Sequence, residues 1–230
     1  MPEPVAFYPL NARYKAAEKK NRQPKGILWN VGITNGPYNE PGGAYMFYGT
    51  SGSYIEFPNR GGLDTQFSIT LMCWVQPGGQ DGSLFVFDTP TPRISLAIVR
   101  GNFVNGMVMQ TRSSEWLTII TTTDVPPAGK WVHVAASYDA SSGNNSLYIN
   151  GRLRASRNNR RPSYRINTAS QRVLMGTRNK FKEYFKGKIA EMKVYDVALN
   201  EAQIQTSIRQ GSCIFFRNRF LITFSGVSFY

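Results

Sequence analysis

Residues 131–151 read WVHVAASYDASSGNNSLYING, and the spacing of their side chains indicates the class of fold. Residues 132–138 alternate in the two-residue period of a half-buried strand. Residues 139–145 are small and polar, as expected of a turn. Residues 146–149 form a second predicted strand, and Asn150-Gly151 predicts a type I′ hairpin because both of its central residues need a positive φ. The stretch therefore predicts antiparallel strands joined by tight turns.

Short strands separated by turns are predicted along most of the chain. They recur at intervals of about 8–12 residues, as in sandwiches and barrels. Further strands are predicted at residues 27–33, 44–47, 84–87, 94–100, 103–109 and 116–122. One short helix is predicted at residues 201–209, with Asn200 as its N-cap. The pattern favours an all-β fold with one short C-terminal helix.

The composition is typical of a single globular domain. The chain has 230 residues, of which 41% are hydrophobic, and this is enough to bury a core without disulfides. No run of about 18 apolar residues predicts a membrane span, and the first residues lack the features of a signal peptide. We expect one domain over residues 1–211. For the apolar tail, residues 212–230, the sequence leaves open a strand packed on the domain or part of a further module.

Several motifs resemble the laminin G-like branch of the concanavalin A-like lectin/glucanase superfamily. The central one is carried by Trp131, His133, Val134, Ala135, Tyr138, Asp139, Leu147, Tyr148, Asn150, Gly151, Ala155 and Ser156. The other matching blocks are residues 45–58, 67–77, 173–176, 187–195 and 198–204. The resemblance implies a two-sheet antiparallel jelly-roll sandwich that works outside cells. It does not fix the function, because one scaffold hosts many activities.

The resemblance also bears on metal binding. Domains of this kind often hold Ca²⁺, which needs carboxylate and carbonyl oxygens. Tyr48 and Ala190 stand where many relatives have acidic ligands, while Glu191, Asp139 and Asp64 remain. A structural calcium ion is therefore doubtful, its ligands are unknown, and no other cofactor is expected.

The sequence argues against an enzyme. Glycoside hydrolysis requires two carboxylates that face one sugar, but the chain has only 14 acidic residues, and Glu183 and Glu191 stand apart from any carboxylate cluster. His133 is the only histidine, and without a paired motif a structural position in a strand is favoured over a base or a metal ligand. Cys73 is expected to be a buried thiol, with a bridge to Cys213 as the alternative.

Positive charge is the main functional signal. The formal net charge is +13, from 27 Lys and Arg against 14 Asp and Glu. Arg side chains bind sulfate and phosphate oxygens in a bidentate manner. The candidate ligand-binding residues are Arg152, Arg154, Arg157, Arg160, Arg161, Arg178, Lys180, Lys182 and Lys186. The same charges could also form only a solvated face that keeps the domain soluble.

These observations predict a non-catalytic extracellular module that recognises carbohydrate or a glycoconjugate. Anionic, sulfated glycans such as glycosaminoglycans are favoured, because a basic surface attracts polyanions. The alternative is a protein–protein cell-adhesion module without glycan specificity, and a glucanase-type hydrolase is disfavoured. No nucleic-acid-binding motif is present, so no nucleic acid is expected as a partner.

Overall fold

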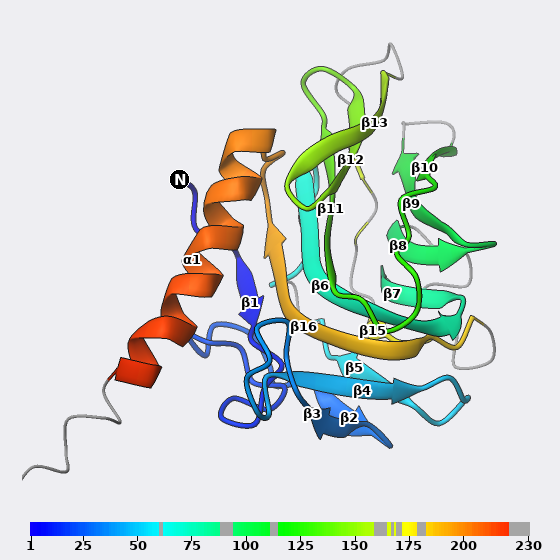
Figure 1. Cartoon of the computed structure of the whole chain (residues 1–230). Coiled ribbons are helices and arrows are strands. Elements are labelled where there is room, and N and C mark those ends of the chain that lie inside the picture. Colours follow the sequence, from blue (N-terminus) through cyan, green and yellow to red (C-terminus); the bar gives the residue numbers. More distant parts are fainter. Residues whose placement is uncertain are drawn as a thin grey trace, which may run out of the picture.

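The computed structural model describes the chain with a few gaps. The described residues are 1–59, 62–87, 94–110, 115–158, 165–166, 168, 172–178 and 183–220, and for residues 105–110, 115–118, 165 and 212–220 they include the backbone alone. Two antiparallel sheets face each other, and one helix lies along the outer face of one sheet (Figure 1). The expected sandwich with a C-terminal helix is therefore confirmed.

Sheet I is the sheet that the helix covers. In spatial order it contains β13 (Arg152–Asn158), β12 (Asn144–Ile149), β11 (Val132–Asp139), β6 (Ile69–Gln80), β16 (Lys186–Tyr195), β4 (Ala44–Tyr48) and β3 (Gly32–Thr34), and β1 (Ala6–Tyr8) also pairs with β16. Sheet II contains β10 (Glu115–Thr122), β9 (Asn102–Gln110), β8 (Ile94–Val99), β7 (Gly82–Phe87), β15 (Val173–Met175), β5 (Tyr54–Phe57) and β2 (Ile27–Trp29), and β14 (Arg165–Ile166) pairs with β9. Non-consecutive neighbours such as β6 and β16 show that the chain crosses repeatedly between the sheets.

The core fills the space between the sheets. The alternating residues of β6, namely Ile69, Leu71, Cys73 and Val75, all point into it. The alternation predicted for residues 132–138 is also confirmed, because the even-numbered residues of this strand belong to the core. Burial of such apolar faces stabilises the fold by roughly 25 cal/mol per Å².

Cys73 is a free thiol inside this core. Burial raises its pKa to about 12, so the thiol stays protonated and unreactive. The alternative of a bridge to Cys213 is therefore wrong, and the interpretation of Cys73 as a small buried side chain is confirmed.

The predicted hairpin at Asn150-Gly151 is present. Asn150 and Gly151 have φ of 50° and 75°, as a type I′ turn requires. The Asn150 side chain also accepts a hydrogen bond from the His133 amide at 3.0 Å. One detail differs upstream, because β12 begins at Asn144 and pairs Asn144 with Asp139, so the turn is shorter than residues 139–145.

The predicted strand at residues 27–33 is in fact two strands in different sheets. β2 pairs with β5 in sheet II, and β3 pairs with β4 in sheet I. Asn30 has a φ of 40°, a left-handed conformation that turns the chain between them. The apolar residues on both sides of Asn30 conceal this crossing in the sequence.

Helix α1 (Glu201–Phe220) begins where predicted but runs on past Arg209 and past the expected boundary at residue 212. Ile204 and Ile208 pack on a second apolar cluster on the outer face of sheet I. Gly211 lies inside the helix, where a Cβ would overlap the Glu191 carboxylate. Within the described part of the chain, no helix is both long and apolar enough to cross a membrane.

The N-terminus of α1 is closed by a capping box. The Gln203 amide donates to Asn200 Oδ1 at 3.0 Å, and the Asn200 amide donates to Gln203 Oε1 at 2.9 Å. We expect Asn200→Ala to lower the free energy of unfolding by about 1 kcal/mol, while Asn200→Ser retains most of it. Urea unfolding of the three proteins measures this, and equal midpoints for all three would show that the cap does not stabilise the fold.

Candidate functional site

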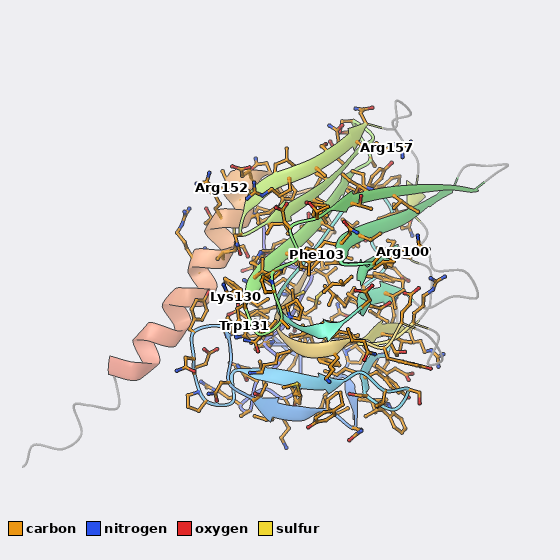
Figure 2. All side chains as sticks on the ribbon, turned by 45° about the vertical axis from the view of Figure 1, so that its right-hand side comes forward. Arg100, Phe103, Lys130, Trp131, Arg152 and Arg157 are labelled. Atoms are coloured by element: carbon orange, nitrogen blue, oxygen red, sulfur yellow. The ribbon has the colours of Figure 1, made fainter. Side chains whose placement is uncertain are left out.

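Three of the candidate arginines lie together on β13, which forms an edge of sheet I. Arg152, Arg154 and Arg157 are all exposed. Arg152 and Arg157 lie at the two ends of the strand, and Arg152 lies beside the start of α1 (Figure 2). Within the described residues, neither Arg152 nor Arg157 has an ion-pair partner. These three residues are called the β13 arginines below.

A bulge sets the direction of these side chains. The register between β12 and β13 shifts, so that Leu147 pairs with Ala155 but Tyr148 pairs with Leu153. The alternation of residues 152–155 in the sequence predicts that Leu153 faces the core together with Ala155. Ala155 does pack against the core, but the extra residue places Leu153 on the outer face, where it is 46% exposed.

Arg154 is partly neutralised. Its Nε lies 3.6 Å from Asp124 Oδ2, on the segment that follows β10. Both side chains are more than one third exposed, so the pair contributes at most about 1 kcal/mol. It connects the edges of the two sheets, and it leaves the guanidinium group accessible to a competing anion.

The remaining candidate residues do not extend this surface within the described chain. Arg178 donates to Glu183 Oε1 at 2.7 Å, and Glu183 also accepts from Ser83 at the start of β7. Lys186 is exposed at the start of β16 and pairs in register with Gln80. Arg160, Arg161, Lys180 and Lys182 lie outside the described residues.

The strand order separates the two groups of cations. β12, β11 and β6 lie between β13 and β16. The strand pairing across the sheet leads from Arg157 through Asn145 and Tyr138 to Ile69, which lies at one end of β6. Lys186 pairs with Gln80 at the other end of β6. The charges that are near one another in the sequence therefore form two separate groups in the fold.

His133 is buried beside an aromatic ring. Its ring meets Trp74 edge-on, with centroids 5.3 Å apart. Burial, with a smaller contribution from the nearby Lys193 ammonium group, lowers its pKa from 6.5 to about 3. The His133 ring is therefore neutral at physiological pH and enclosed by other side chains. This agrees with the structural position in a strand that the sequence predicted.

Glu191 and Lys193 form a buried pair beneath α1. Lys193 Nζ lies 3.8 Å from Glu191 Oε2 and donates to both the carbonyl oxygen and the hydroxyl of Ser207. Burial raises the pKa of Glu191 and lowers that of Lys193, and each partner's charge opposes the shift of the other. The sequence analysis missed this pair, because a bulge in β16 and a φ of 52° at Glu191 place both residues outside the simple alternation.

The other carboxylates considered for calcium lie apart from Glu191. Asp139 accepts hydrogen bonds from Ser141 and Ser142 in its own turn, and Asp64 accepts from Asn59 at 2.6 Å. Among the described residues, no group of three or more His, Cys, Asp or Glu side chains is placed to hold a metal ion.

Comparison with known proteins gives the family. A laminin G-type model of the concanavalin A-like lectin/glucanases superfamily matches residues 49–205. The chain therefore belongs to this superfamily, in agreement with the motifs in its sequence. No curated protein matches the chain by sequence.

Solved structures share the fold at low identity. Domain 4 of AbnA, an extracellular arabinanase from Geobacillus stearothermophilus in complex with arabinotriose, has a TM-score of 0.69 and 21% identity over 89% of this chain and 97% of that one. The ligand-binding domain of botulinum neurotoxin serotype D, in complex with N-acetylneuraminic acid, has a TM-score of 0.70 and 13% identity over 90% of this chain. The binding domain of Paraclostridial Mosquitocidal Protein 1 has a TM-score of 0.69 and 15% identity over 88% of this chain. The chain spans about half the length of both toxin domains, 50% and 51% respectively.

The state of His133 can be measured directly, because it is the only histidine. Its pKa is lower in the folded than in the unfolded protein, so its contribution to stability is complete above pH 6.5 and is lost as the pH falls from 6.5 towards 3. We expect the ring resonances in NMR spectra to stay constant from neutral pH down to the acid limit of folding. Titration with a midpoint near 6.5 in the folded protein would contradict the buried neutral state.

Proposed function

We propose that this chain is a non-catalytic recognition module that binds carbohydrate or a glycoconjugate, with anionic, sulfated glycans favoured. The observation that carries the proposal is the row of exposed arginines on β13, of which Arg152 and Arg157 lack ion-pair partners in the described structure. A guanidinium group can donate two parallel hydrogen bonds to a sulfate group. Three such groups on one edge strand suit a ligand with repeated negative charges.

The length of the strand fits a polymer better than a single sugar. β13 has seven residues, and a strand rises about 3.3 Å per residue, so Arg152 and Arg157 are separated by roughly the length of several sugar units. By sequence, Arg160 and Arg161 would continue this row, and Arg178, Lys180, Lys182 and Lys186 would form the second contact of a long chain. Binding of this kind weakens as salt screens the charges.

The solved structures with the same fold are consistent with recognition of sugars outside cells. One of them is a domain of an extracellular enzyme bound to an arabinose oligosaccharide, and another is bound to a sialic acid. We infer an extracellular location for this chain by the same reasoning. Its partners would be glycosaminoglycans or the glycans of an extracellular protein.

The surroundings of two carboxylates, Glu183 and Glu191, favour a role without catalysis. Glycosidases need two carboxylates that face the sugar at separations of about 5–9 Å. Glu183 is occupied by Arg178 and Ser83, and Glu191 is buried against Lys193 under the helix. Neither residue is placed to act on a substrate.

A protein–protein adhesion role is the second candidate, and one observation favours it. Ile27 and Trp29 on β2, Ile33 on β3 and Tyr48 on β4 are each 46–48% exposed. β2 and β3 are edge strands of the two sheets and β4 is the neighbour of β3, so the four side chains lie near one end of the sandwich. Exposed apolar groups of this kind mark contact surfaces between proteins.

Neutralising the β13 arginines tests the main proposal. Replacing Arg152, Arg154 and Arg157 by Gln removes three sulfate contacts of about 0.5–1 kcal/mol each, which predicts a 10- to 100-fold loss of affinity for heparin. The measurement is elution from heparin under a salt gradient, together with elution from a simple cation exchanger.

The matched control replaces Arg13, Lys15 and Lys25, which are also exposed, by Gln. It removes the same charge at a different place, so it should leave heparin elution well above that of the β13 variant. If both variants lose heparin retention equally, the binding depends only on net charge, and the proposal of a specific arginine surface is wrong.

A further inference from the structure

A pocket of about 300 Å³ lies between α1, β1 and the segment before β2. Figure 1 shows the chain's first residues and β1 beside the helix. The walls come from residues 1–4, the turn at residues 18–22, the end of β16 and residues 207–211 of α1. Its volume lies at the lower end of the range for small-molecule sites, so it can hold one small molecule.

Two ammonium groups converge on one ring in this pocket. Lys193 Nζ lies 5.0 Å from the centroid of the Phe7 ring, and Lys19 Nζ lies 5.2 Å from the same centroid. The two like charges repel each other, and after the larger effect of burial Lys19 contributes to the lowered pKa of Lys193. An anion placed near both groups would relieve this repulsion.

The carboxylates that line the pocket, those of Glu3 and Glu18, are already paired. Glu18 is buried, and its carboxylate accepts hydrogen bonds from the amides of Phe7, Lys20 and Arg22. Lys20 and Arg22 both lie close to Glu3, at 2.7 and 3.8 Å. Lys19, by contrast, has no carboxylate within 4 Å among the residues that the structure describes.

The charge count indicates the sign of the ligand's charge. Lys19 and Lys193 contribute two positive charges, and Glu191, 3.8 Å from Lys193, offsets one of them when ionised. The amino group of Met1 also lines the pocket, so the charge that remains is positive and favours an anion. Gln210 adds an exposed amide group to the wall, which can bind a further oxygen atom of the same molecule. The hydroxyls of Ser207 and Tyr195 are buried and hydrogen-bonded to each other at 2.9 Å.

We propose that this pocket binds one small organic carboxylate of the size of a single acidic sugar, with its carboxylate between Lys19 and Lys193. The Phe7 ring forms the apolar side of the site, Gln210 binds a hydroxyl group, and Ser207 holds the Lys193 ammonium group in place. This site is separate from the β13 arginines, because β13 contacts the start of α1 through Leu153 and Glu201, whereas the pocket lies at residues 207–211.

The test is an NMR titration of the full chain labelled with ¹⁵N, with sodium glucuronate as the probe and glucose as the uncharged control. We expect glucuronate to shift the amide signals of Phe7, Lys19, Ser207 and Gln210 with a dissociation constant of about 1 mM, and glucose to shift none of them. Lys19→Gln should weaken binding by about tenfold. Lys25→Gln removes the same charge from an exposed residue outside the pocket and should leave the affinity unchanged.

A disaccharide that ends in glucuronate tests whether the pocket binds only a free sugar acid or also the end of a longer glycan. Shifts of the same amide signals with either molecule support the proposal. Ser207→Ala provides a second variant that keeps the charge of the pocket and should also weaken binding. Glucuronate that shifts none of these amides, or equal affinities of the Lys19 and Lys25 variants, would overturn the proposal. The β13 triple variant should bind glucuronate normally, so failure of this site and failure of the heparin surface are distinguishable.

Discussion

The whole structure depends on the burial of two sheet faces against each other in one apolar core. Aromatic side chains link the two layers in this core. Tyr8 of sheet I packs against Phe57 of sheet II with ring centroids 4.4 Å apart, and Phe57 in turn lies 6.4 Å from Phe85. Because these inner faces are filled, recognition has to use the edges and outer faces of the sandwich. The β13 arginines occupy an edge, and the Lys19–Lys193 pocket occupies an outer face under α1.

The charge on β13 has two physical effects. An edge strand exposes unpaired backbone groups that could pair with another chain, and charged side chains discourage this pairing. Arg152, Arg154 and Arg157 protect the edge of sheet I in this way. The same exposure leaves their guanidinium groups accessible to the proposed polyanion, so protection of the edge and the proposed binding do not require different residues.

Local patterns in the sequence predicted the elements that depend on local geometry. The alternation of residues 132–138, the Asn150-Gly151 turn and the Asn200 cap each follow from a few neighbouring residues. The combined family motifs predicted the sandwich itself. Features that depend on β-bulges, in which one strand carries one extra residue, were not predicted. The bulge in β13 places Leu153 on the outer face. The bulge in β16 places Glu191 and Lys193 under the helix.

The sequence also could not show which strands lie between two groups of residues in the fold. The candidate cations from Arg152 to Lys186 are close in the sequence, but three strands separate the described members of the two groups. The helix also continues past Gly211. At this position the glycine allows a close approach to the Glu191 carboxylate and does not end the helix. A sequence pattern cannot distinguish a glycine that ends a helix from one that allows a close approach, because it does not show which residue packs against the glycine. For the same reason it could not predict the pocket, whose walls come from segments far apart in the chain.

The most direct test of the account is to map where a sulfated glycan contacts the protein. A heparin hexasaccharide and its desulfated counterpart would be titrated into ¹⁵N-labelled protein, and the shifts of all assigned amides would be compared. The account predicts that the largest shifts fall on Arg152–Asn158 and on the segment around Asp124, that they disappear with the desulfated sugar, and that added salt weakens them. Shifts spread evenly over all exposed Lys and Arg residues, or concentrated on the apolar edge at Ile27, Trp29 and Ile33, would contradict it.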